Sequence, residues 1–169
     1  ILNKTNVVLC LGKEGSTIGD REWTLAYIST LPTDINIIPR GGVYLFPLYV
    51  YDQEGQAHIN FTSSIIENIE SRIGLRLQPI EDKERKEGGF LAINLLDYIY
   101  AVLHSPRYRK TYHECLQDGF PTIPYPTSSE YFFQLAELGQ RIRKLHLLEG
   151  IERKDIFTSF PISIPKDNN

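Results

Sequence analysis

The stretch that decides the fold is Asp97-Tyr-Ile-Tyr-Ala-Val-Leu-His-Ser-Pro-Arg-Tyr-Arg109, which joins an apolar segment to a cationic one. Residues 90–104 are apolar around most of a helical circumference, so they predict a buried central helix. Ser105 can cap the helix that follows, and Pro106 suits its first position, where a missing N–H costs nothing. The stretch therefore predicts a buried helix, a corner, and a second helix over 106–117.

Two capping boxes predict further helices on either side of this stretch. The residues that form them are Ser64 with Glu67 and Thr127 with Glu130. A hydroxyl followed three residues later by a glutamate satisfies two backbone donors at a helix start. The boxes predict helices over 64–73 and 128–148.

The N-terminal third is rich in β-branched and aromatic residues, which favour strands. These runs predict strands near residues 6–11, 22–29, 35–38 and 43–51. Pro47 interrupts the last run, and because proline cannot donate to a ladder it indicates a sheet edge, a bulge or a split into two strands.

The order of these elements predicts the fold class. A β-rich part over 1–60 precedes a helical part over 61–150 and an extended tail over 151–169. Because strands and helices do not alternate, the order favours an α+β fold, with a mostly antiparallel N-terminal sheet, over a parallel doubly wound one. We expect a single domain over residues 1–169.

Composition bounds the function. The chain has 169 residues, of which 41% are hydrophobic and 23% charged, and its formal net charge is −3. A domain that gains its affinity mainly from phosphate contacts is usually basic, so the charge argues against autonomous nucleic-acid binding but leaves room for a local cationic face. The chain starts with Ile1 and contains no Met, which predicts a piece of a longer protein.

The two cysteines and the hydropathy indicate a cytoplasmic protein. Cys10 and Cys115 lie far apart in the sequence and form no disulfide framework, so we expect reduced thiols. No apolar run approaches the roughly 20 residues that span a bilayer, so we expect no membrane association.

Tests for catalysis find little. The sequence contains neither a Gly-rich loop ending in Gly-Lys-Ser/Thr nor a Gly-x-Ser-x-Gly elbow. Glu84-Arg85-Lys86 resembles half of a metal-dependent nuclease signature, which would make the chain a stand-alone hydrolase or nuclease. The triplet lies within the charged run 81–87, which favours a solvated connector instead. We expect no catalytic and no metal-binding residue.

Arg107, Arg109 and Lys110 open the predicted helix 106–117, with tyrosines between them. Arginine and tyrosine together can hold phosphates and stack on bases. The alternative is that Arg107 pairs with a carboxylate such as Asp97 or Glu114. We also expect a solvated cationic face at Arg141, Arg143 and Lys144.

Other DNA-contact candidates lie in and just beyond the predicted loops of the β-rich part, because loops between strands can carry base-reading side chains. They are Lys13, Ser16, Thr17, Arg21, Trp23 and Arg40. An ordinary polar hairpin would also explain the first five.

Three segments of the chain resemble the C-terminal specificity region of type ISP single-chain restriction–modification enzymes. They are Gly42-Val-Tyr-Leu-Phe-Pro-Leu-Tyr-Val-Tyr51, the stretch 97–109, and Phe120-Pro-Thr-Ile-Pro-Tyr-Pro126 with Phe133-Gln-Leu-Ala-Glu-Leu-Gly139 and Leu145-His-Leu147 after it. Their order and spacing agree over nearly the whole chain.

The resemblance implies a role in target recognition. The longer protein would contain a nuclease, a helicase-like ATPase and an N6-adenine methyltransferase before this region, with S-adenosylmethionine, ATP and Mg²⁺ bound there and no cofactor here. The region would contact double-stranded DNA and the methyltransferase and helicase modules of its own polypeptide. The remaining alternative, motivated by the negative charge and the many aromatic residues, is a non-catalytic protein-interaction or scaffold domain, which predicts a large exposed apolar patch.

Overall fold

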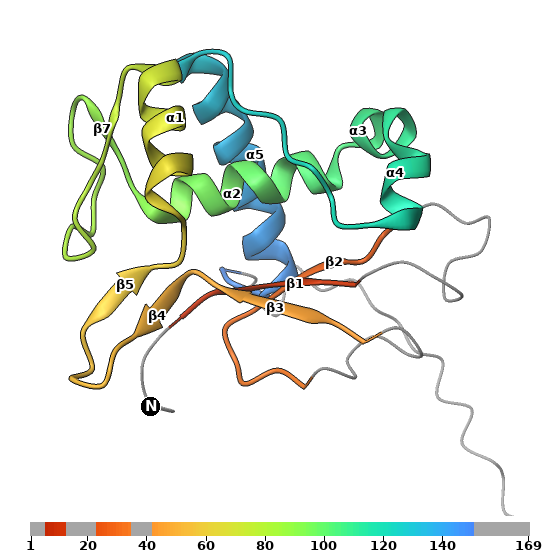
Figure 1. Cartoon of the computed structure of the whole chain (residues 1–169), viewed down its shortest axis with the longest axis horizontal. Coiled ribbons are helices and arrows are strands. Elements are labelled where there is room, and N and C mark those ends of the chain that lie inside the picture. Colours follow the sequence, from red (N-terminus) through yellow and green to blue (C-terminus); the bar gives the residue numbers. More distant parts are fainter. Residues whose placement is uncertain (1–5, 13–22, 35–41, 151–169) are drawn as a thin grey trace, which may run out of the picture.

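A layer of helices covers a small antiparallel sheet in the computed structural model, which describes residues 6–12, 23–34 and 42–150 (Figure 1). The predicted α+β class is confirmed. The predicted strand 35–38 and the tail 151–169 lie outside the described residues.

The main sheet has three strands in the order β2-β1-β3, all antiparallel. Their bounds are Val8–Leu11 for β1, Ala26–Ser29 for β2 and Tyr44–Pro47 for β3. Leu9 pairs with Ile28 on one side and with Phe46 on the other, so these three residues share the face that the helices cover.

Pro47 splits the predicted strand 43–51. β3 ends at Pro47, while β4 (Tyr49–Tyr51) leaves the main sheet and pairs with β5 (Ala57–Ile59) as a separate hairpin. The split confirms one of the three outcomes that the missing N–H allowed. Two short strands, β6 (Arg76–Leu77) and β7 (Gly89–Phe90), form a parallel pair inside the predicted helical part, and the sequence patterns missed them as well as β5.

Two long helices cross over the sheet. They are α2 (Ala92–His104), which is buried on most sides as expected, and α5 (Ser129–His146). The helices approach closely at Gly139, where any Cβ atom would overlap the carbonyl oxygen of Asp97. Aromatic rings also pack in this contact, with Phe132 of α5 lying 5.5 Å from Tyr98 of α2, measured between ring centroids.

Three shorter helices complete the layer. α1 (Ser63–Ile73) lies beside α5, and α3 (Pro106–Thr111) and α4 (His113–Asp118) lie at the far end of α2 (Figure 1). The predicted helix 106–117 is therefore wrong as a single element, because it breaks at Tyr112. Both predicted capping boxes are also wrong: Thr62 precedes α1 without a side-chain cap, and Ser128 caps α5 by accepting a hydrogen bond from the backbone N–H of Tyr131.

An ion pair is buried between α2 and α5. Asp97 is 0% exposed and Arg143 is 8% exposed, and the guanidinium donates from Nε to Oδ1 at 2.6 Å and from Nη2 to Oδ2 at 3.1 Å. Burial raises the pKa of Asp97, while the hydrogen bonds and charge of Arg143 oppose that rise. The expectation that Arg143 belongs to a solvated face is wrong, and so is the suggested pairing of Arg107 with Asp97.

The segment between α4 and α5 is tied to the helices by two tyrosines. The hydroxyl of Tyr98 donates to the carbonyl of Pro124 at 2.8 Å, and that of Tyr108 donates to the carbonyl of Thr122 at 2.9 Å. Pro126 is fully buried. The segment 120–126 therefore lies along α2 in a fixed position.

Candidate nucleic-acid interface

Two cations of α3 point into solvent. Ser105 caps this helix by accepting from the backbone N–H of Tyr108 at 3.3 Å, and Pro106 occupies its first turn, as the sequence predicted. Arg107 and Lys110 are exposed, and no described carboxylate lies within ion-pair distance of either. Since residues three apart share a helix face, the two charges can act together on one anionic strand.

Arg109 turns the other way and closes the C-terminal end of α2. Its Nε donates to the carbonyl of Leu103 at 2.7 Å, and its Nη2 lies 3.1 Å from Nδ1 of His104. A guanidinium can only donate, so Nδ1 of His104 accepts and its hydrogen resides on Nε2. Arg109 therefore stabilises the corner between α2 and α3, and its side chain is half-buried.

His104 is held in its neutral form. Burial, the positive charge of Arg109 and the neighbouring His146 together lower its pKa to about 4, in that order of importance and against an opposing effect of the Ala26 backbone. Nδ1 of His146 and the hydroxyl of Tyr100 form a hydrogen bond of 2.6 Å. His104, Arg109 and His146 line a cavity of about 370 Å³ beside β2. His104 and His146, which lie far apart in the sequence, thus meet through tertiary packing, with ring centroids 5.2 Å apart.

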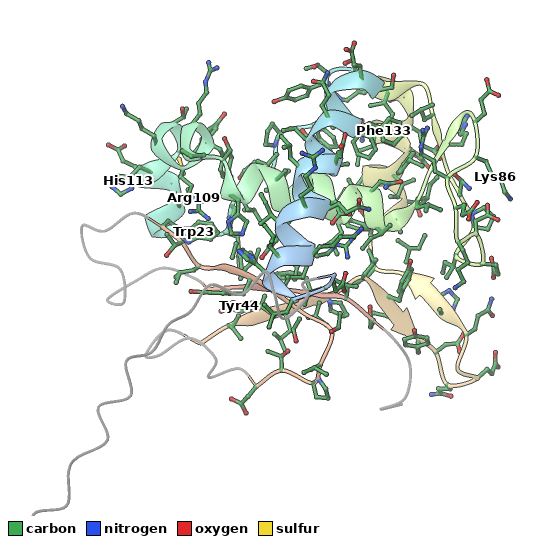
Figure 2. The ribbon with its side chains drawn as sticks, turned by 180° about the vertical axis from the view of Figure 1, so that it is seen from behind. Trp23, Tyr44, Lys86, Arg109, His113 and Phe133 are labelled. Carbon is green, nitrogen blue, oxygen red and sulfur yellow. The ribbon has the colours of Figure 1, made fainter. Side chains whose placement is uncertain are left out.

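The connected end of the β1–β2 pair, where Leu11 pairs with Ala26, lies at the same end of the molecule as α3 and α4 (Figure 1). The backbone N–H of Gly12 donates to the carbonyl of Leu25 at 2.9 Å, so Gly12 and Leu25 continue the pairing of the two strands at this end. Figure 2 shows Trp23, Arg109 and His113 gathered at this end. Thr24, just after Trp23, lines the same cavity as Arg109.

Most loop candidates lie outside the described residues. These are Lys13, Ser16, Thr17, Arg21 and Arg40. Trp23 is described and is 1% exposed, so in this structure its ring belongs to the core and presents no face to a base.

The charged run 81–87 forms a closed surface loop. Buried Gln78 donates to Asp82 and accepts from the backbone N–H of Lys86, whose ammonium pairs with Asp82 at 2.7 Å. Glu84 and Lys86 are exposed, so they lack the buried strand setting that a nuclease centre needs. In the described part of the chain, no three His, Cys, Asp or Glu side chains are grouped to hold a metal ion.

The family of the chain follows from its sequence as a whole. Residues 2–167 match the family described as the Type ISP C-terminal specificity domain. The chain belongs to this family.

Two solved structures contain a region similar to this specificity domain. One is described as a DrdV–DNA complex, with a TM-score of 0.66 and 22% identity over 89% of this chain and 13% of that one. The other is a nuclease-deletion mutant of the Type ISP restriction-modification enzyme LlaGI with a DNA substrate mimic, with a TM-score of 0.55 and 23% identity over 86% of this chain and 10% of that one. A search of curated protein sequences gave no match. The specificity domain thus spans about a tenth of the length of these solved chains.

The stretch 97–109 is internal framework in this specificity domain. Its polar side chains make the ion pair to α5, the hydrogen bonds to the segment 120–126, the cap of α3 and the closure of α2. Arg107 is the exception, because it faces solvent.

Sequence reasoning missed the partner of Asp97, although a signal was present. A single carboxylate inside an apolar helix requires a buried cation, and a helix as long as α5 can supply one.

Among the described residues, none of the helices has the length and apolar composition that crossing a bilayer requires.

Proposed function

We propose that this chain recognises a short DNA sequence for a longer restriction–modification enzyme and positions that DNA for an N6-adenine methyltransferase and a helicase–nuclease in the same polypeptide. The observation that supports the proposal most is the family match over residues 2–167. The DNA in the DrdV and LlaGI structures supports double-stranded DNA as the partner.

The end of the molecule that carries α3 is the best candidate for the DNA-facing surface. Arg107 and Lys110 supply exposed positive charge, and Thr24, which leads into β2, lines the same cavity as Arg109 of α3. Phosphate contacts fix the register of a protein on DNA, whereas base edges in the major groove carry the sequence information. We assign the phosphate contacts to Arg107 and Lys110 and the base contacts to side chains among residues 13–22, where Lys13, Ser16, Thr17 and Arg21 remain candidates.

The chain makes and breaks no covalent bond in this proposal. Methyl transfer, ATP hydrolysis and DNA cleavage belong to other modules, which would bind S-adenosylmethionine, ATP and Mg²⁺. Those modules would also provide most of the phosphate affinity, which is consistent with the net charge of −3. The enzyme would act in the cytoplasm.

The phosphate assignment is tested with the double variant Arg107→Ala/Lys110→Ala in the complete enzyme. A plot of log K against log salt concentration has a negative slope, and each lost phosphate contact should make that slope shallower by about 0.9. Arg141→Ala is the matched control, because Arg141 is an exposed cation of α5 that already pairs with Glu137. A double variant whose affinity and salt slope equal those of the wild type would contradict the assignment.

A protein-interaction role is a second candidate function, and one observation favours it. The rings of Tyr44, Phe46 and Phe120 are close together and each is more than a third exposed. Such a patch on a small domain marks a surface for another molecule. Recognition and docking can coexist, because the patch and the cations of α3 consist of different residues.

A further inference from the structure

An apolar groove runs between the sheet, α1, α2 and the segment 120–126. It consists of two cavities of about 430 Å³ and 330 Å³. Both cavities are lined by Phe61, Ile65, Ile99 and Ile123, so they form one continuous depression. We call this depression the apolar groove.

The apolar groove contains no charge. None of the described residues that line either cavity is Asp, Glu, Lys, Arg or His. Its floor is formed by Leu9 and Leu11 of β1, on the sheet face that α2 and α5 cover only in part. A DNA strand requires cations along its phosphates, so the groove has the wrong chemistry for DNA.

Two exposed aromatic rings, Phe46 and Phe120, line the apolar groove, and a third, Tyr44, packs against Phe120. Tyr44, Phe46 and Phe120 are 47%, 41% and 44% exposed. Phe120 contacts the other two edge-to-face, with ring centroids 4.7 Å from Tyr44 and 6.0 Å from Phe46. Because removing exposed apolar surface from water is favourable, these rings favour an apolar ligand.

The walls of the apolar groove are fixed. The segment 120–126 is one wall, and Tyr98 and Tyr108 bind its carbonyls at Pro124 and Thr122. α1 and α2 form the opposite wall with regular helical backbone. Because the groove needs no rearrangement to receive a ligand, binding would cost little ordering on this side.

We propose that the apolar groove receives an apolar segment, an amphipathic helix in the simplest case, from another module of the same polypeptide. Similar regions make up only 13% and 10% of the DrdV and LlaGI chains, so most of such a polypeptide lies outside this domain. A domain that reads DNA for a distant catalytic module must hold a fixed orientation to it, which a single covalent connection does not ensure. The choice of occupant therefore rests on the proposed function. A helix laid into a groove supplies such a contact through apolar residues at i, i+3 or i+4, and i+7.

The proposal is tested by hydroxyl-radical footprinting of the complete wild-type enzyme without DNA. We expect Tyr44, Phe46 and Phe120 to react with hydroxyl radicals no faster than the buried rings of Tyr98 and Tyr100. Reactivity well above that of the buried rings would overturn the proposal. Protection that requires added DNA, or that grows with enzyme concentration, would also overturn it, because DNA or a second copy would then be the occupant.

Variants separate this proposal from the proposed function. Phe46→Glu/Phe120→Glu should lose site-specific methylation, whereas Leu138→Glu, at a 50% exposed position of α5 outside the groove, should retain it. Arg107→Ala/Lys110→Ala should weaken DNA binding and leave the groove footprint unchanged. If the chain had no part in DNA recognition, that double variant would bind DNA normally while the groove stayed protected.

Discussion

Breaking the buried ion pair between Asp97 and Arg143 should cost more stability than removing the pair altogether. Arg143→Met would leave the Asp97 carboxylate 0% exposed and without its cation. An uncompensated buried charge costs about 3–5 kcal/mol. Burial already raises the pKa of Asp97, so the carboxyl can relieve part of this penalty by taking up a proton, and we expect the lower end of that range.

The double variant Asp97→Leu/Arg143→Met removes both charges and keeps a similar apolar volume. Replacing a buried ion pair by packed apolar side chains is often neutral or stabilising. We therefore expect the free energy of unfolding of the double variant to lie within about 1 kcal/mol of the wild-type value. Asp97→Leu alone should be destabilised, because Arg143 would retain only Glu149, at 3.8 Å and close to solvent.

Equilibrium unfolding in urea measures these differences, and fluorescence of Trp23 reports the transition because it is the only tryptophan and is buried. The midpoint should shift with little change in the denaturant slope. A cost below about 1 kcal/mol for Arg143→Met, or a double variant that loses the sum of the two single effects, would refute the reasoning.

Three further predictions concern the framework. Gly139→Ala should cost about 3 kcal/mol or more because its Cβ would overlap the α2 backbone, whereas Gly119→Ala, with open space around it, should change stability little; urea midpoints that agree for the two would contradict this. Folding lowers the pKa of His104 from 6.5 to about 4, so the unfolded state takes up this proton at a higher pH than the folded state does. The free energy of unfolding should therefore fall by up to about 3 kcal/mol as the pH drops from about 6.5 to about 4. His104→Asn should flatten this dependence on pH, and an unchanged dependence would disprove the assignment. Tyr98→Phe and Tyr108→Phe should each cost about 1 kcal/mol, since each leaves a carbonyl of the segment 120–126 without its donor, and thermal unfolding as high as that of the wild type would argue against such anchoring.

The features of this structure that depend on neighbouring residues were predictable from the sequence. The missing N–H of Pro47 marked the end of β3, and Ser105 with Pro106 marked the start of α3, because these effects act within a few residues. Strands β5, β6 and β7 were not visible in the sequence, since two or three residues are too few to show a periodicity and tertiary packing determines them.

The candidate interface was predictable only in part. Residue type identified Arg107 and Lys110, but the same reasoning included Arg109 and Trp23, which the fold uses for a helix corner and for the core. Which arginine turns inward depends on contacts with Leu103 and His104, and no spacing rule contains that information. The apolar groove was likewise invisible, because its residues come from β1, β3, α1, α2 and the segment 120–126 together.

The most direct test of DNA recognition exchanges residues 2–167 in the complete enzyme for the corresponding domain of a family member with a different target sequence. Mapping of methylated adenines in plasmid DNA then reports the specificity of the hybrid. The account predicts that the hybrid methylates the target of the donor. A hybrid that continues to methylate the target of the recipient would contradict it.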